Sequence, residues 1–151
     1  MVEFSDFECP YCTRAAEVAN QIKQKYPKDV RFIFRHFPLS FHKKAHLASQ
    51  ASLAANEQGK FWEYHDLIFA NQRALDRADL EGHAKKLGLN MKKFNAALDS
   101  AKYKAAVDGD LKLGGLVAVN GTPSMFINGK RIANPTDMAN VSKVIDAELA
   151  K

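Results

Sequence analysis

The alternation of hydrophobic and polar residues predicts a β-α-β unit at the start of the chain. Residues 2–7 are short, aromatic and roughly alternating, which indicates a strand. Apolar residues then recur at helical spacing over 15–22, and Pro10 suits the first helical turn because its missing N–H would be unpaired there. Residues 29–37 are rich in β-branched and aromatic side chains and stop at Pro38, so they predict a second strand. A helix between two strands implies that the strands run parallel.

The middle of the chain, from residue 42 to about 117, shows only helical signals. Gly59 and Gly88 are typical of helix C-termini, and Asp76 and Asn90 of helix N-termini. We interpret this part as a helical insertion that packs on the sheet. Its expected helices cover residues 45–58, 61–69, 76–87, 90–98 and 103–111.

The end of the chain returns to a sheet pattern. Residues 124–127 predict a strand, and Asn128-Gly129 is the strongest short signal for a type I′ hairpin turn. Residues 130–133 are expected to pair back on it, and a final helix is expected to start around 135–137. The order of elements is therefore β-α-β, a helical block, then β-β-α.

Composition and charge narrow the function classes. A chain of 151 residues, 46% hydrophobic and 26% charged, suits one globular domain with a sizeable core. No apolar run approaches the ~18 residues of a membrane-spanning helix. The net charge of +5 is dispersed over helix surfaces, without an aromatic-interleaved basic patch, so we expect no nucleic-acid partner. Met1 and Val2 lead directly into the first strand, so we expect either a cytosolic protein or a trimmed mature form.

The only two cysteines, Cys9 and Cys12, are the strongest chemical signal in the chain. Both lie at a predicted helix start, where unpaired N–H groups and the helix dipole stabilise a negative sulfur. Cys9 is therefore the expected nucleophile, with a lowered pKa, and Cys12 the resolving thiol. The intervening Pro10 and Tyr11 are expected to tune the redox potential.

Two alternatives for the cysteines involve no redox chemistry. A structural disulfide across so short a loop would stabilise little. A zinc site would need two more ligands, and the spacing of His36, His42 and His46 matches no metal signature. We therefore expect no metal, and no cofactor other than the redox-active Cys9–Cys12 disulfide.

Three further residues are candidate site residues. Pro123 stands at a loop-to-strand junction, where beside a Cys-x-x-Cys site a cis bond after Thr122 is expected, although an ordinary trans turn is the alternative. A cis bond would leave the Thr122 backbone free to pair with an extended substrate. Glu3 in the first strand could exchange a proton with Cys12, or could simply reach solvent at the sheet edge.

These motifs together resemble the DsbA-like thiol:disulfide oxidoreductases. The resemblance covers nearly the whole chain, and its specificity lies in the ordered combination. It implies a thioredoxin-like α/β fold made of residues 1–40 and 117–151, with residues 41–116 as an all-helical insertion after the second strand. The segments that carry it are 2–12 (VEFSDFECPYC), 35–39 (RHFPL), 58–62 (QGKFW), 121–123 (GTP) and 128–129 (NG).

The resemblance also implies roles and partners. It makes Cys9 the nucleophile, Cys12 the resolving thiol, Thr122-Pro123 the cis-proline loop and Glu3 the family's buried acid. It implies a periplasmic or otherwise extracytoplasmic monomer that oxidises reduced secreted proteins and is re-oxidised by a DsbB-like membrane partner. Three departures matter: this chain starts too late to contain all of a strand that usually precedes the Cys-x-x-Cys strand, Pro-Tyr replaces the Pro-His of strongly oxidising DsbA, and Asn134-Pro135 stands where relatives often have glycine. The second departure implies a milder oxidant.

Disulfide donation to folding proteins is thus the function that the sequence favours. A disulfide isomerase or reductase on the same scaffold stays open as the alternative, because the motif does not set the direction of exchange. A non-enzymatic peptide-binding module is a further alternative. The glutathione-dependent branch of the fold is disfavoured, because it normally has serine at the position of Cys9.

Overall fold

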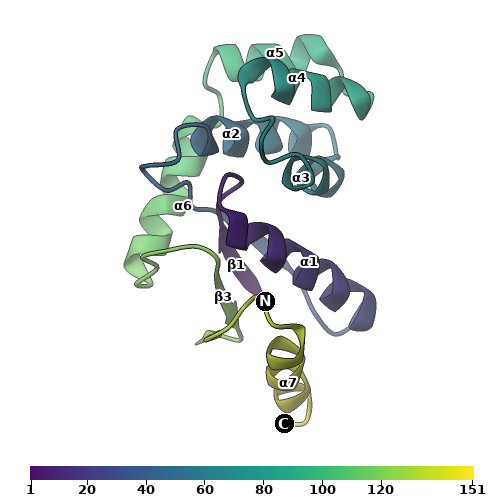
Figure 1. Ribbon diagram of the computed structural model, residues 1–151, viewed down its shortest axis with the longest axis vertical. Helices are drawn as coiled ribbons and strands as arrows, with labels where there is room; N and C mark the ends of the chain where they lie inside the picture. Colours follow the sequence, from purple (N-terminus) through teal and green to yellow (C-terminus); the bar gives the residue numbers. More distant parts are fainter.

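The computed structural model describes residues 1–151 and is built on one four-stranded sheet (Figure 1). The strands are β1 (Val2–Ser5), β2 (Ile33–His36), β3 (Ser124–Ile127) and β4 (Lys130–Arg131), in the order β2-β1-β3-β4. Strands β1 and β2 are parallel, whereas β3 is antiparallel to both β1 and β4. The predicted β-α-β unit is therefore confirmed, with β1 inside the sheet.

Seven helices surround the sheet. Figure 1 shows α2 to α5 gathered beyond one end of the sheet and α7, with the C-terminus, at the opposite end. None of the helices is both long and apolar enough to cross a bilayer. The helices are α1 (Pro10–Lys25), α2 (Ala45–Glu57), α3 (Phe61–Phe69), α4 (Arg77–Lys86), α5 (Met91–Asp99), α6 (Lys104–Leu116) and α7 (Met138–Leu149).

The turn and cap residues named from the sequence act as predicted. Gly59 and Gly88 follow α2 and α4 with positive φ, a conformation that glycine adopts without steric cost. Asn90 caps α5 by accepting from the Lys93 amide at 3.0 Å. Asn128 and Gly129 both have positive φ, as a type I′ turn requires.

The apolar core has two parts that meet along α1. The larger cluster joins Phe7, Cys9 and Cys12 to the helical block, where Tyr64 and Phe94 are fully buried. The smaller cluster packs the other side of α1 against β3, Ile132 and α7. Both cysteines thus lie in the apolar contact between the sheet unit and the helical block.

The last helix starts where the sequence predicted, with Asp137 as its N-cap, but several strand boundaries were wrong. The first strand ends at Ser5, because residues 6–9 turn, and the fourth ends at Arg131 instead of residue 133. The second strand starts at Ile33 instead of residue 29. Its register explains this: Val2, the first residue of β1, pairs with Ile33, and before it only the Met1 amino group reaches back, donating to the Arg31 carbonyl at 2.7 Å.

Candidate active site

The two cysteines lie where β1 gives way to α1. Residues 6–9 form a tight turn in which the Cys9 amide donates to the Asp6 carbonyl at 3.2 Å. Cys9 is the N-cap of α1, and Pro10 begins the helix. Both cysteines are free thiols, with Cys9 5% exposed and Cys12 fully buried. Cys9 is therefore slightly exposed to solvent, whereas Cys12 is shielded from it.

The surroundings of Cys9 favour its thiolate. The Cys12 thiol donates a hydrogen bond to the Cys9 sulfur, and Thr122 and the first-turn amides of Cys12 and Tyr11 act in the same direction. Burial opposes them, but together they lower the pKa of Cys9 to about 5. Cys9 is therefore mostly ionised at neutral pH.

Cys12 has the opposite character. Burial raises the pKa of its thiol far above the usual range, and the neighbouring Cys9 sulfur raises it further. The Asp6 amide nevertheless points at the Cys12 sulfur, 3.4 Å away. The pair therefore consists of one ionised and one protonated sulfur, which suits the two successive roles in thiol–disulfide exchange.

The loop before β3 faces Cys9, although 113 residues separate them. The Thr122–Pro123 peptide bond is cis. The Cys9 sulfur lies 3.7 Å from the Thr122 carbonyl oxygen, to which the thiol donates when it is protonated. The fold therefore brings together the cysteine pair and the proline loop, as the sequence predicted.

Glu3 is fully buried in β1 and does not reach solvent. Neither of its carboxylate oxygens has a hydrogen-bond partner, and burial raises its pKa to about 7. The Ser5 hydroxyl and the Lys23 ammonium act against this rise. Ser5 also lowers the pKa of Cys12, and its buried hydroxyl has no hydrogen-bond partner.

The side chains of Pro10 and Tyr11 lie on the surface. Tyr11 is 62% exposed, and its ring lies 5.6 Å from the Arg14 guanidinium. Phe41 is similarly exposed, at 71%, in the segment that follows β2. His36, by contrast, is buried with an unpaired Nδ1, and burial lowers its pKa to about 3.

Sequence reasoning missed two residues that hold the active-site turn. The buried Asp6 carboxylate accepts from the amides of Glu8 and Leu39, each at 2.7 Å, and lies 2.8 Å from His42 Nδ1. The Gln72 side chain, between α3 and α4, donates to two carbonyls of the turn. Asp6 could have been suspected from its place before the motif, whereas no signal marks Gln72.

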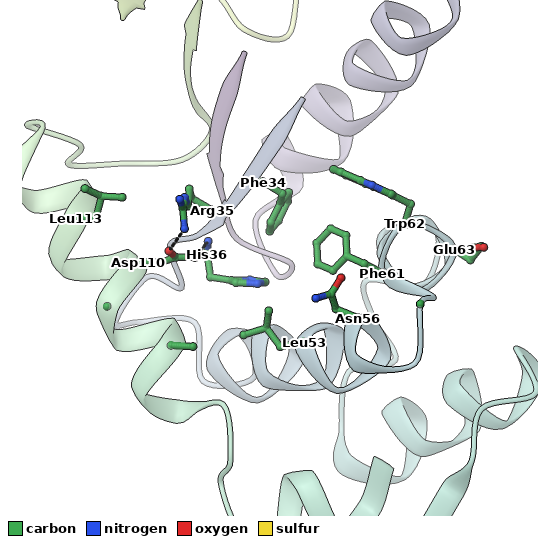
Figure 2. Close-up of a pocket in the computed structure, with 13 residues that line it drawn as sticks. Phe34, Arg35, His36, Leu53, Asn56, Phe61, Trp62, Glu63, Asp110 and Leu113 are labelled. Atoms are coloured by element: carbon green, nitrogen blue, oxygen red, sulfur yellow. Dashed lines mark hydrogen bonds and ion pairs between the residues drawn. The ribbon is translucent and has the colours of Figure 1, made fainter. Parts of the chain in front are cut away.

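A cavity of about 700 Å³ lies elsewhere, between β2 and helices α2, α3 and α6 (Figure 2). Phe34, Phe61 and Trp62 line one part of it, and the Arg35–Asp110 ion pair, at 3.0 Å, lies at the other. Neither cysteine lines this cavity. The cysteine pair therefore lies at the sheet–helix junction and outside this cavity.

Known proteins are similar to this chain in sequence and in fold. The family model described as Thioredoxin matches residues 1–147. The chain is 37% identical over 151 residues to the Na(+)/H(+) antiporter NhaA 3 of Salinispora tropica, a match that covers 99% of this chain and 23% of the antiporter. The chain thus spans about a quarter of the length of the curated relatives that it matches.

Solved structures match over almost the whole chain. BdbD from Bacillus subtilis, in its oxidised form, is 26% identical with a TM-score of 0.89, covering 99% of this chain and 86% of BdbD. The thiol-disulfide exchange protein alpha-DsbA2 from Wolbachia pipientis is 20% identical with a TM-score of 0.86, covering 97% of this chain and 80% of the other, which shows a shared fold. The chain therefore belongs to the thioredoxin family and has the fold of the DsbA-like thiol–disulfide oxidoreductases.

Proposed function

We propose that this chain is a protein thiol–disulfide oxidoreductase that works through Cys9 and Cys12. The observation that carries the proposal is the asymmetry of the pair. Cys9 has a lowered pKa and lies at the N-terminus of α1 opposite the Thr122 carbonyl, whereas Cys12 is buried and protonated. A structural thiol pair has no need of such an arrangement, while thiol–disulfide exchange depends on it.

In the donor direction the reaction starts from the Cys9–Cys12 disulfide. A substrate thiolate attacks the Cys9 sulfur, the Cys9–Cys12 bond breaks, and Cys12 leaves as a thiolate that takes up a proton. A second substrate thiolate then attacks the substrate sulfur bound to Cys9, and the Cys9 thiolate leaves. The substrate dithiol is oxidised to a disulfide by two electrons, and the cysteine pair is reduced.

Glu3 is the group best suited to the proton transfer at Cys12. With a pKa near neutrality it can give a proton to the departing Cys12 thiolate and take one back in the reverse reaction. The buried Ser5 hydroxyl lowers the pKa of both groups. Thr122 would meanwhile pair through its backbone with an extended substrate beside Cys9.

The lowered pKa of Cys9 favours disulfide donation over reduction. A stabilised thiolate stabilises the reduced form of the pair, so the oxidised form gives up its disulfide readily. The physiological assignment follows the family resemblance: extracytoplasmic location, reduced secreted proteins as substrates and a membrane partner for re-oxidation. An isomerase or reductase is the second candidate, favoured by the Pro10-Tyr11 dipeptide, which provides no histidine to stabilise the thiolate further.

The reduction potential of the Cys9–Cys12 pair tests the proposal. Equilibration with glutathione buffers, followed by thiol counting, should give a value nearer to that of DsbA, about −120 mV, than to that of thioredoxin, about −270 mV. A value near thioredoxin would refute disulfide donation and favour the reductase. Failure of the pair to form a disulfide at all would refute the oxidoreductase assignment.

A further inference from the structure

One glutamine outside the sheet unit holds the backbone of the active-site turn. Gln72 lies in the segment between α3 and α4, 63 residues from Cys9. Its Nε2 donates to the carbonyl oxygens of Phe7 and Cys9, each at 2.9 Å. A single side-chain amide therefore uses both of its hydrogens on the turn that carries the nucleophile.

The segment that carries Gln72 is itself firmly held. The Asn71 amide donates to the Ile68 carbonyl at 3.1 Å, and the Ala74 amide to the Asn71 carbonyl at 2.8 Å. Leu75 is fully buried in the same apolar cluster as both cysteines. Gln72 is thus presented to the turn by a fixed segment of the helical block.

The two carbonyls that Gln72 binds matter for the charge at Cys9. Carbonyl oxygens carry partial negative charge, and the Cys9 carbonyl belongs to the residue whose thiolate must be stabilised. That carbonyl also accepts the Cys12 amide at 3.1 Å, so its orientation sets the first turn of α1 relative to the sulfur. A donor on both oxygens offsets their charge and fixes the turn.

We propose that Gln72 is a positioning residue for the thiol chemistry: by binding the Phe7 and Cys9 carbonyls, it holds the Cys9 sulfur against the first-turn amides of α1. This inference rests on the proposed function and adds to it a residue that positions the nucleophile. The helical block then not only covers the active site but also contributes to the reactivity of the nucleophile. Loosening this segment from the turn would make Cys9 a poorer nucleophile and leaving group.

The test is a series of substitutions of similar length at one partly exposed position. Gln72→Met removes both hydrogen bonds, Gln72→Glu places a carboxylate against the carbonyls, and Gln72→Lys restores a donor with a positive charge.

The Cys9 pKa is measured on the reduced protein from the ultraviolet absorbance of the thiolate as a function of pH. We expect it to rise in Gln72→Met, to rise further in Gln72→Glu and to fall to or below the wild-type value in Gln72→Lys. At a pH near the wild-type Cys9 pKa, the alkylation rate of Gln72→Met should fall roughly two- to tenfold, the range expected for loss of a hydrogen bond.

Gln58 provides a matched control. Its side chain also makes two hydrogen bonds to backbone, donating to the Asn90 carbonyl at 3.2 Å and accepting from the Asn90 amide at 2.7 Å, and neither bond involves the active-site turn. Gln58→Met should lower the free energy of unfolding to a similar extent as Gln72→Met and leave the Cys9 pKa unchanged. Equal pKa values throughout the Gln72 series, or an equal shift in Gln58→Met, would overturn the proposal.

The two proposals fail separately. The Cys9 pKa is measured without substrate or oxidant, so the Gln72 series gives its answer even in a chain that exchanges no disulfides. A reduction potential near that of thioredoxin would refute disulfide donation alone. A flat Gln72 series in a protein with the potential of an oxidant would refute the positioning role alone.

Discussion

The stability of the reduced protein should depend on pH through Cys9. The ordinary pKa of a cysteine thiol is 9.0, and in the folded chain that of Cys9 is lowered to about 5. Because the lowered pKa belongs to the folded state, the thiolate contributes stability that is complete above pH 9 and disappears as the pH falls through 5. Each pH unit between these limits corresponds to about 1.4 kcal/mol, so the contribution at pH 7 is at most about 2.7 kcal/mol.

The perturbation that isolates this contribution is Cys9→Ser, compared with the wild type under reducing conditions. Urea unfolding at several values between pH 5 and pH 8 gives the free energy of unfolding of both proteins, and the other titrating groups cancel in the difference. We expect the difference to grow as the pH rises, with a slope approaching about 1.4 kcal/mol per pH unit. A difference that stays constant over this range would refute a thiolate at Cys9.

Three further predictions concern packing, acid stability and proton transfer. Gly114→Ala in α6 would place its Cβ 2.6 Å from the Phe37 ring and should cost about 1–3 kcal/mol in chemical denaturation, whereas Gly115→Ala meets open space and should stabilise by about 0.5–1 kcal/mol; equal effects would contradict this packing. The pKa of buried His36 falls from 6.5 to about 3, so acidification from pH 6.5 to 4.5 should cost about 2.3 kcal/mol of folding free energy, since the unfolded state binds the proton first. His36→Gln should flatten this part of the pH profile, and an unchanged profile would contradict a buried neutral imidazole. Glu3→Gln should leave Cys9 alkylation intact but slow the release of a mixed disulfide by Cys12 about 100-fold in stopped-flow experiments; an unchanged release rate would exclude proton transfer by Glu3.

The order of elements could be predicted because hydrophobic periodicity and turn residues report local structure. The strand ends could not, because they depend on partners far away in the sequence. Phe32 is a residue type that favours strands, yet β1 pairs with β2 only from Ile33 onward. The Phe32 ring packs instead on Trp62, with ring centroids 5.4 Å apart. Asp6 likewise continues an alternating pattern, but its carboxylate accepts the Glu8 amide and turns the chain.

The residues of the candidate site also fall into two groups, those that a local sequence signal identifies and those that depend on distant contacts. Cys9 and Cys12 could be named from their spacing and helix position, and Thr122 and Pro123 from a proline at the start of a strand. Gln72 could not, because it acts through backbone carbonyls, which every residue has and no sequence motif records.

The central claim is that Cys9 is the sulfur that exchanges with protein thiols. Cys12→Ser removes the resolving thiol, so a mixed disulfide formed at Cys9 should persist. This variant is incubated with an unfolded protein whose cysteines are activated as mixed disulfides with a small thiol, which leaves when the Cys9 thiolate attacks. Intact-mass and peptide analysis should then show one covalent adduct on Cys9. The adduct should disappear on addition of reductant and should not form with Cys9→Ser. No adduct on Cys9 under conditions in which free cysteine reacts would contradict the account.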